Sequence, residues 1–457
     1  MVHRHVILGV VAVAILGLDP ARAQAADESG TAVAPTTDVE AMVLAARKLL
    51  ADRYVLPDVA AKLDEALARA ASSGTFQGLS GEALAARVNS VMSQVTADVH
   101  LQIRYQPALS ALLASAPGES TPNSSEWDKA LARQLQRTNA GVRKLEMLPG
   151  NIRYLAYDSF GWGAPVAQQA IATAMEFLRH GDAIIIDLRN NAGGSTYAEA
   201  AIASYFLPPH TKLNRFEMRG MLGETTETTA APFSLAGKPT FVLIGPATVS
   251  GAEWFATHAS TFGFGTLVGA TTRGGGYTIR TFPLPGDYVL SVSVGRALDA
   301  LTNFDLEGIG VEPAIAVSPD KALVAAQATA MERLLAGMSD AESAQGERLL
   351  AFYRAQVTST ASALPLENYV GRYGEFTVET QHGDLMIRFQ DFSPDVLMPV
   401  APNIFAPASE PSTQIRFAFD GSAVVALELD SGNGPPARIA RTIAVGPLTS
   451  QVLPFSK

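Results

Sequence analysis

Apolar residues recur at helical spacing in the first part of the chain. Val59, Leu63 and Leu67 follow one another at intervals of four residues, as on the buried face of a helix. Residues 100–105 (HLQIRY) then alternate between polar and apolar side chains, a pattern typical of a strand. These patterns predict an N-terminal helical domain over residues 38–105 that ends in a strand.

Short, continuous apolar runs alternate with helical patterns in the middle of the chain. The runs at residues 183–188 (AIIIDL) and 239–244 (PTFVLI) lack polar alternation, as strands buried on both faces do. A helical pattern at 165–179 precedes the first run, and another at 251–261 follows the second. Strands that alternate with helices predict an α/β core with a largely parallel sheet, here over residues 141–330.

The texture of the sequence changes at Pro365, where short alternating segments begin and turn signals such as Gly383-Asp384 and Asp420-Gly421 separate them. We expect residues 365–457 to form a separate small β domain. Residues 106–130, between the N-terminal strand and the core, are rich in Pro, Ser, Gly and Asn and predict a loop or lid.

Composition narrows the possible functions. The 457 residues are 47% hydrophobic and 17% charged, a balance that suits two or three folded domains and excludes general disorder. The formal net charge of −10 comes without any basic tract, so nucleic acid is not an expected partner. There are no cysteines, which removes disulfides, thiolate metal sites and a cysteine nucleophile.

The N-terminus has the pattern of a secretory signal peptide. Residues 1–5 (MVHRH) are basic, residues 6–18 are apolar, and residues 21–25 (ARAQA) offer small side chains at the spacing of a cleavage site. We expect residues 1–25 to be removed and the mature protein to be periplasmic or secreted; the alternative is an uncleaved N-terminal anchor. No second apolar segment approaches spanning length, so no membrane span is expected in the mature chain.

The segment 248–256 (TVSGAEWFA) places Ser250 between a buried strand and a helix. Free backbone N–H groups and the helix dipole favour negative charge at such a point, and the oxyanion formed on an attacked carbonyl is a charge of this kind. Spacing alone also allows a plain N-cap, in which Glu253 is the capping-box partner of Ser250.

A second segment, 187–195 (DLRNNAGGS), also follows a buried strand. The pair Gly193-Gly194 lets the backbone approach a bound group and present its N–H, although an ordinary turn from strand to helix has the same composition. The glycine run lacks the lysine and the spacing of a phosphate-binding loop, so a nucleotide site is not indicated.

A serine nucleophile needs a base, and His100 at the mouth of the predicted strand is the best candidate, although a lone histidine at a strand edge is more often structural. His258 lies eight residues after Ser250 on the same predicted helix, about 12 Å along its axis, and should not contact it. The other histidines outside the leader stand at a helix end, in a Pro-Pro loop and in the C-terminal domain: His180, His210 and His382.

The two core segments resemble, in their order and spacing, the serine peptidase family of C-terminal processing peptidases, tricorn core and interphotoreceptor retinoid-binding protein. The resemblance covers roughly residues 40–330, about two thirds of the chain, and implies a crotonase-like α/β catalytic core. The N-terminal helices resemble the retinoid-binding-protein-like branch in particular. Besides the two core segments, the resemblance rests on 54–58 (YVLPD), 98–105 (DVHLQIRY), 265–269 (GTLVG) and 307–313 (EGIGVEP).

The family has two catalytic solutions. Processing peptidases pair the serine with a lysine from a Gly-Lys-Gly turn, but here Gly275 stands at the lysine position. Tricorn-like members use a histidine from the N-terminal segment and a glutamate near the end of the core, which His100 and Glu307 match. By resemblance, the N–H groups of Gly251 and of Gly193 or Gly194 form the oxyanion hole.

Two departures from the family pattern stand out. Tricorn-like sites have a serine directly before the histidine, whereas this chain has Val99. Processing peptidases carry a PDZ module before the core, and residues 106–140 are too few for one. The C-terminal segment 366–373 (LENYVGRY) weakly resembles β modules appended to β-lactamase-like hydrolases, and no chemistry is assigned to it.

The sequence therefore predicts an exported serine peptidase that acts on a peptide or protein. Ser250 is the expected nucleophile, His100 the base and Glu307 the supporting carboxylate. No metal or cofactor is implied, and the oligomeric state is not predicted. The alternatives are a non-catalytic protein that binds an apolar ligand or peptide in the same cleft, and a hydrolase of a non-peptide acyl compound.

Overall fold

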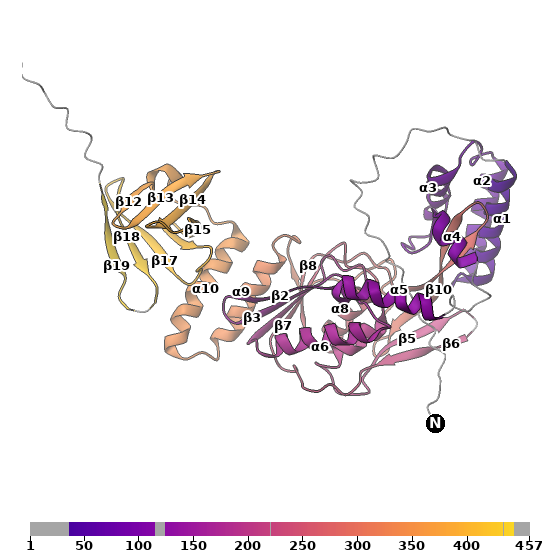
Figure 1. Ribbon diagram of the computed structural model, residues 1–457, viewed down its shortest axis with the longest axis horizontal. Coiled ribbons are helices and arrows are strands. Elements are labelled where there is room, and N and C mark those ends of the chain that lie inside the picture. The colour runs from indigo at the N-terminus through magenta and orange to yellow at the C-terminus, as the bar shows by residue number, and fades with distance from the viewer. Residues whose placement is uncertain (1–35, 115–123, 220, 433, 443–457) are drawn as a thin grey trace, which may run out of the picture. The chain divides into compact units, whose positions relative to one another are not determined.

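The computed structural model describes residues 36–114, 124–219, 221–432 and 434–442 (Figure 1). The chain divides into two compact units, the first formed by residues 1–147 and 153–322 and the second by residues 148–152 and 323–457. Among the described residues, no helix is long and apolar enough to cross a membrane.

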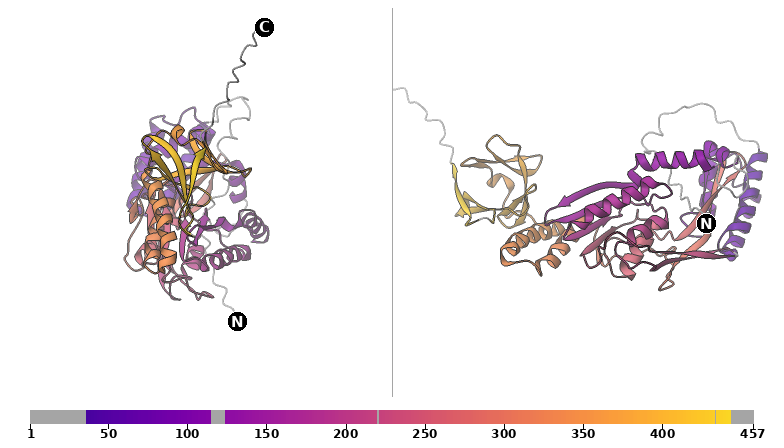
Figure 2. Two further views of the ribbon diagram at one scale, coloured as in Figure 1. Left: turned by 90° about the vertical axis from the view of Figure 1, so that its left-hand side faces the viewer. Right: turned by 60° about the horizontal axis from the view of Figure 1, so that its bottom comes forward.

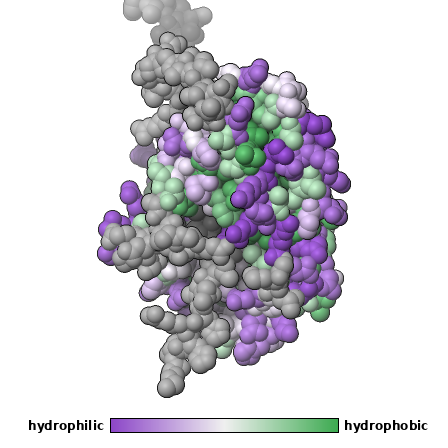
Figure 3. Space-filling model, turned by 90° about the vertical axis from the view of Figure 1, so that its right-hand side faces the viewer, coloured by the Kyte–Doolittle hydropathy of each residue, from purple (hydrophilic) through white to green (hydrophobic). Residues whose placement is uncertain are grey.

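The first unit begins with three helices, α1 (Thr36–Arg53), α2 (Pro57–Ser72) and α3 (Gly81–Ser93). The apolar faces of these helices do not form a separate core of their own. They share one core with strands from much later in the chain, in which Leu63 and Val88 meet Leu290 and Val292. Hydrophilic side chains cover much of the outer surface in Figure 3, as expected of helices with one buried face.

Those strands form a five-stranded antiparallel sheet. The strand order is β1-β10-β5-β6, and β9 also pairs with β10. The predicted strand at 100–105 is shorter in the structure, because the carboxylate of Asp98 accepts the backbone N–H of His100 and holds that residue in a turn before the strand. The bounds are β1 (Gln102–Tyr105), β5 (Lys212–Met218), β6 (Met221–Glu227), β9 (Tyr277–Leu284) and β10 (Tyr288–Asp299).

Part of the segment predicted to be a loop is helical. Helix α4 (Pro107–Ala114) starts on a proline, which suits a first helical turn, and α5 (Ser124–Arg137) follows; residues 115–123 lie outside the described residues. Pro107 and Ser124 therefore stand at the starts of helices rather than inside a loop.

A six-stranded sheet forms the centre of the first unit, in the order β11-β8-β7-β4-β3-β2. Strands β4, β7, β8 and β11 are parallel, and every residue of β4 and β7 is buried, as the continuous apolar runs predicted. The strands are β2 (Val142–Leu148), β3 (Ile152–Tyr157), β4 (Ala183–Asp187), β7 (Thr240–Ile244), β8 (Thr266–Gly269) and β11 (Ile315–Ala316).

Helices α6 (Pro165–Arg179), α7 (Thr196–Ala203) and α8 (Gly251–Thr261) pack on this sheet. Figures 1 and 2 show α6 lying along it, and one apolar core joins Met175 of α6 and Phe255 of α8 to Ile186 of β4. The parallel strands point their carboxyl ends toward the loops that precede α7 and α8. The architecture is thus a mixed α/β fold whose functional loops follow β4 and β7.

The second unit contains helices α9 (Ala322–Leu335) and α10 (Asp340–Thr358) and a closed eight-stranded barrel. The barrel has its own core, which includes Tyr369, Phe405 and Phe417. Its strands are β12 (Gly371–Tyr373), β13 (Phe376–Gln381), β14 (Asp384–Phe389), β15 (Asp395–Ala401), β16 (Ile404–Pro407), β17 (Gln414–Asp420), β18 (Ala423–Asp430) and β19 (Ala437–Thr442).

Candidate active site

Ser250 stands in a strained turn between β7 and α8. Its backbone angles are φ 59° and ψ −125°, a region that residues other than glycine rarely adopt. An ordinary N-cap has extended backbone angles with negative φ, so Ser250 differs from a plain cap even though the carboxylate of Glu253 accepts its N–H as in a capping box. A strained turn from strand to helix is the position in which hydrolase folds expose a nucleophilic serine.

The Glu253 side chain holds this turn in place. It is fully buried, and its Oε2 accepts the N–H groups of Ser250 and Gly275, each at 2.8 Å. Its Oε1 accepts the Thr272 hydroxyl at 2.5 Å and the Gly274 N–H at 2.6 Å. These bonds compensate the desolvation of a buried carboxylate and tie the serine turn to the glycine turn at 274–276. Sequence reasoning identified Glu253 only as a capping residue, because its other partners lie about twenty residues away in the chain.

Gly193 and Gly194 approach the serine closely. A β-carbon at Gly193 would lie 2.7 Å from the Ser250 β-carbon, so no side chain fits there. The N–H of Gly193 donates to the Asn191 side chain at 2.8 Å, whereas among the described residues the N–H groups of Gly194 and Gly251 have no acceptor. A β-carbon on Gly251 would lie 3.3 Å from the Gly194 nitrogen, which places these two glycines side by side. The geometry therefore favours Gly194 over Gly193 as the partner of Gly251.

His100 lies beside the serine turn. A β-carbon at Gly275 would meet the His100 Cε1 at 2.9 Å and a methyl group of Val249, the residue before Ser250, at 3.0 Å. Among the described residues, the buried Nδ1 of His100 has no hydrogen-bond partner. Burial lowers the pKa of His100, against the opposing charges of Asp98 and Glu253, so the imidazole is neutral at pH 7 and able to accept a proton.

The glycine turn leaves no room for the lysine of a processing peptidase. A β-carbon at position 275 would lie within about 3 Å of His100, Val99 and Val249, where no real side chain fits without a shift. A Ser-Lys dyad at this turn is therefore excluded both by sequence and by packing.

Glu307 is bound to the other end of the glycine turn. Its Oε2 accepts the N–H of Gly276 at 2.6 Å and that of Tyr277 at 3.1 Å, and its buried Oε1 has no partner among the described residues. Burial, reinforced by the charge of Asp98, raises the pKa of Glu307 to about 8. The carboxyl is therefore largely protonated at pH 7.

Asp98 is a functional candidate that sequence reasoning missed. The side chain is buried and accepts hydrogen bonds from the Tyr54 hydroxyl at 3.0 Å and the His100 N–H at 2.9 Å. Its negative charge acts to raise the pKa of both His100 and Glu307. The signal was an acidic residue two positions before the candidate base. All three predicted residues lie close to the turn at 274–277. Glu253 accepts N–H groups from both Ser250 and this turn, His100 packs against Gly275, and Glu307 accepts N–H groups of Gly276 and Tyr277.

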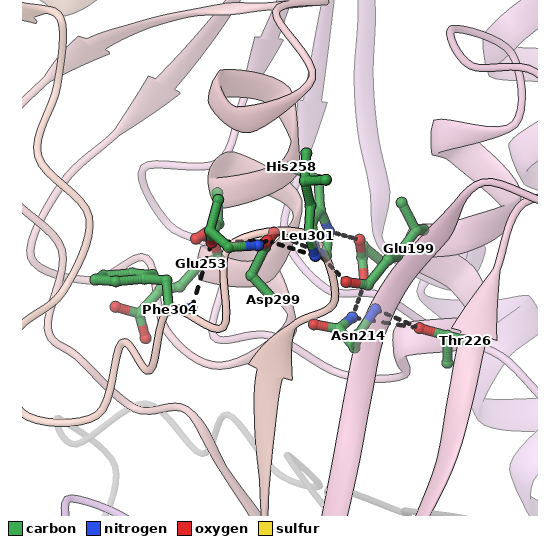
Figure 4. Close-up of polar contacts among 11 residues, drawn as sticks. Glu199, Asn214, Thr226, Glu253, His258, Asp299, Leu301 and Phe304 are labelled. Carbon is green, nitrogen blue, oxygen red and sulfur yellow. Dashed lines mark hydrogen bonds and ion pairs between the residues drawn. The ribbon is translucent and has the colours of Figure 1, made fainter.

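The remaining core histidines lie elsewhere. His258 is fully buried on α8, with Nδ1 2.5 Å from Glu199 and Nε2 3.1 Å from the Leu213 carbonyl (Figure 4). His210 is exposed and pairs with Glu227 at 3.1 Å. Among the described residues, neither forms a hydrogen bond or an ion pair with the serine turn, so the geometry favours His100 as the base.

Two family models match large parts of the chain. Residues 151–317 match the model of peptidase family S41, and residues 24–139 match that of the N-terminal domain of peptidase S41 in eukaryotic IRBP. A carboxyl-terminal-processing protease of Picosynechococcus sp. is 31% identical over 132 residues, which are 29% of this chain and 31% of that protein. The chain therefore spans about a third of the length of this curated relative.

Solved structures of similar proteins have low sequence identity. A peptidase from Parabacteroides merdae shares 18% identity at a TM-score of 0.44, covering 62% of this chain and 90% of its own. The photosystem II D1 C-terminal processing protease shares 15% identity at a TM-score of 0.38, and the match covers 63% of this chain and 94% of that protein. The tricorn protease shares 15% identity at a TM-score of 0.39, and the match covers 65% of this chain and 37% of that protein.

The two family matches, over residues 24–139 and 151–317, are both to models of peptidase family S41. Over these residues the resemblance to this serine peptidase family seen in the sequence is confirmed. The match at residues 24–139 also agrees with the likeness of the N-terminal segment to the retinoid-binding-protein branch.

Proposed function

We propose that this protein hydrolyses peptide bonds, with Ser250 as nucleophile, His100 as general base and Glu307 as the supporting carboxylate. The observation that carries the proposal is the strained Ser250 turn, which stands beside a neutral imidazole with a buried Nδ1 and beside two N–H groups that have no acceptor in the described part of the chain. Strained backbone, unused donors and a histidine poised to accept a proton cost stability individually, and together they have the form of a catalytic site.

The chemistry follows from these positions. The Ser250 hydroxyl oxygen attacks the scissile carbonyl carbon while His100 takes its proton, and the N–H groups of Gly251 and Gly194 stabilise the oxyanion. His100 then returns the proton to the leaving amine, and an acyl-enzyme remains. A water molecule then attacks the acyl carbon while His100 takes its proton. The bond between the acyl carbon and the Ser250 oxygen breaks, the product carboxylic acid leaves, and His100 returns the proton to the Ser250 oxygen.

Glu307 supports the histidine in this scheme. When His100 takes the serine proton it becomes a cation in a buried site, and a nearby anion lowers the free energy of that cation. The charges of Asp98 and Glu253 already act on His100. In this proposal Glu307, which binds the same glycine turn, adds a further anion once it is ionised. The Asp98 carboxylate also fixes the backbone of His100 by accepting its N–H. Tricorn-like sites have a serine directly before the histidine, but in this chain that position is Val99, which has no hydroxyl.

The substrate is a peptide or protein in this proposal, as the family and the name of the curated relative suggest. We also propose that the α/β core is crotonase-like, in keeping with the family resemblance and the parallel strands β4, β7 and β8.

Two measurements test the activity. A fluorophosphonate probe should label the protein on Ser250. In a digest, a peptide library should be cleaved at least as fast as a matched library of esters. Absence of labelling would favour a binding protein, and exclusive cleavage of esters would favour a non-peptide acyl hydrolase. The labelled residue is identified by peptide mass mapping.

We further propose that the chain is exported through a cleaved signal peptide. The basic, apolar and small-residue regions of residues 1–25 support this, and residues 1–35 lie outside the described structure. Intact-mass measurement after expression in a bacterial host should give a mature start near residues 24–27. A protein that retains Met1, or stays in the cytoplasm, contradicts the proposal.

A further inference from the structure

Asn191 lies where three segments of the first unit meet. The residue is fully buried, its Oδ1 accepts the N–H of Gly193 at 2.8 Å, and its Nδ2 donates to the carbonyl of Tyr157, the last residue of β3, at 2.7 Å. Its backbone carbonyl accepts the N–H of Val249, the residue before Ser250, at 3.0 Å. Asn191 therefore connects the end of β3, the oxyanion glycines and the serine turn.

These contacts go beyond those of an ordinary turn. An asparagine that accepts the N–H of the second residue after it is common in loops, and that bond alone implies no function. Here the amide also donates to Tyr157, and it is excluded from water. Because a carbonyl only accepts and an N–H only donates, both bonds form in one orientation of the amide. The Asn191 side chain therefore fixes the direction of the Gly193 N–H.

The two glycines that follow need such a restraint. Gly193 and Gly194 have φ of 95° and 139°, and glycine has access to more backbone conformations than any other residue. The carbonyl of Gly193 accepts the N–H of Phe160 at 2.9 Å. That carbonyl and the N–H of Gly194 belong to one trans peptide plane and point in opposite directions. Holding Gly193 at both its N–H and its carbonyl therefore sets the direction of the Gly194 N–H.

The restraint separates a used donor from an unused one. The N–H of Gly193 is bound by Asn191, whereas that of Gly194, beside Gly251, has no acceptor among the described residues. An oxyanion hole is most effective when its donors are fixed before the charge develops, because no free energy is then spent on turning them during the reaction. A flexible glycine pair provides such a donor only while its neighbours hold it.

We propose that Asn191 is a positioning residue of the oxyanion hole, which holds the Gly193 N–H and thereby keeps the Gly194 N–H directed at the oxygen of the attacked carbonyl. This rests on the proposed peptidase function and adds a residue to it. Asn191 itself does not contact the substrate. Its loss weakens the stabilisation of the transition state, where the oxyanion forms, and leaves the binding of the uncharged ground state as it is.

Two substitutions at this position give a graded test. Asn191→Ala removes the acceptor of the Gly193 N–H, whereas Asn191→Ser keeps a hydroxyl that accepts the same N–H more weakly. On a peptide cleaved in the library digest, Asn191→Ala should lower kcat by about ten- to a hundredfold, less than removal of a donor would, and Asn191→Ser should lie between it and the wild type. KM should stay within about twofold, and the acid limb of His100 should keep its midpoint.

Asn214→Ala and Asn214→Ser are matched controls. Asn214 on β5 is also fully buried, and its amide donates to Glu199 at 3.0 Å, but it forms no hydrogen bond with the serine turn or the oxyanion glycines in the described part of the chain. These variants should unfold at lower denaturant, while the folded protein keeps kcat within about twofold of the wild type. Equal losses of kcat at the two positions, or a wild-type kcat in Asn191→Ala, overturn the proposal.

Fluorophosphonate labelling separates this inference from the activity itself. The phosphoryl oxygen of the probe occupies the same hole, so the first-order labelling rate should fall in parallel with kcat across the Asn191 variants. A wild-type protein that is never labelled refutes the proposed function, whereas labelling at equal rates in the wild type and both Asn191 variants refutes this inference alone.

The labelled wild type provides a test that needs no variant to fold. Its crystal structure should place the phosphoryl oxygen on the N–H groups of Gly194 and Gly251, with the Gly193 N–H still bound to Asn191. A phosphoryl oxygen bound by the Gly193 N–H instead would show that Asn191 does not hold that group away from the hole, and the proposal would be wrong.

Discussion

At the scale of single residues, the backbone of Ser250 favours the proposed nucleophile over a plain helix cap. Its positive φ costs free energy that a side-chain cap does not require, and a catalytic hydroxyl would account for that cost. Glycine adopts this conformation without strain.

Substitution of Ser250 should therefore separate activity from stability. Ser250→Ala and Ser250→Gly should both lose at least three orders of magnitude in kcat, about the loss expected when a nucleophile is removed. Ser250→Gly should unfold at higher denaturant than Ser250→Ala, by about 1 kcal/mol, because relief of strain exceeds the entropy cost of glycine. Chemical denaturation of both variants checks this. An alanine variant that keeps a few per cent of activity would exclude Ser250 as the nucleophile.

The pKa of His100 fixes the acid side of the activity profile. The base must be neutral to accept a proton, and burial lowers its pKa, so kcat/KM should fall on acidification with a midpoint below the ordinary value of about 6.5. His100→Ala should abolish nearly all activity. His210→Ala is the control, since His210 is exposed and pairs with Glu227, and it should keep the full profile. Normal rates in the His100 variant would refute the assignment.

Glu307 should add a second rise at higher pH. Its pKa of about 8 means that the supporting anion forms only as the pH passes that value, so kcat/KM should increase between about pH 7 and 9. Glu307→Gln keeps the shape of the side chain but cannot ionise, and it should remove this rise while leaving the limb of His100. A wild-type profile that is flat from pH 7 to 9 contradicts a role for the ionised carboxyl.

The sequence named these residues but not their surroundings. Ser250, His100 and Glu307 were identified through family motifs, which carry residue identity and order. The choice of Gly194 over Gly193 depends on a hydrogen bond from Gly193 to Asn191, and local spacing does not encode which N–H is already used. The direction of the His100 pKa depends on burial by segments more than a hundred residues away, such as Val249 and Gly275.

At the scale of elements, the two helices that follow the catalytic loops are joined by a buried polar contact. Helix α7 follows Gly194 and carries Glu199, while α8 follows Ser250 and carries His258. A carbonyl oxygen only accepts, so the His258 Nε2 donates to Leu213, and its Nδ1 shares a proton with the Glu199 carboxyl (Figure 4).

Breaking this contact from one side should be costly. His258→Phe leaves Glu199 buried without its main partner, removes the 3.5 Å contact of His258 Nε2 with the buried Asp299, and should destabilise the protein by about 3–5 kcal/mol. In the double variant His258→Phe/Glu199→Gln the loss should be smaller than the sum of the two single losses, because position 199 no longer carries an uncompensated charge, although Asp299 still does. Equilibrium unfolding of the four proteins measures the coupling. Strict additivity would mean that the pair does not interact.

Element prediction succeeded where the pattern was local. Strands β4 and β7 were predicted because strands covered on both faces are apolar at every position. Helices α4 and α5 were missed because α4 has only eight residues and begins at a proline, and α5 begins with two serines, residue types that also mark loops. The pairing of β1 with β10 joins residues nearly two hundred positions apart, and no spacing rule reports such a contact.

At the scale of the whole molecule, the C-terminal barrel is closed and has its own core. Strand β12 pairs with β19, so no strand edge is left unpaired, and every buried residue of the barrel core lies between Tyr369 and Leu427. A barrel that completes its own hydrogen bonds and core does not need the α/β core in order to fold.

A chain that ends at residue 364 should therefore keep a folded catalytic unit. The proposed site draws only on residues of the first unit, so fluorophosphonate labelling of Ser250 should proceed within about twofold of the full-length rate. Some loss of solubility is expected, because Gln345 and Arg348 of α10 lose their hydrogen bonds to Ser412. A second chain that ends at residue 322, the boundary of the first unit, removes α10 as well and serves as the control. Should both truncated chains bind no probe while remaining soluble, the second unit would be part of the active enzyme rather than an independent domain.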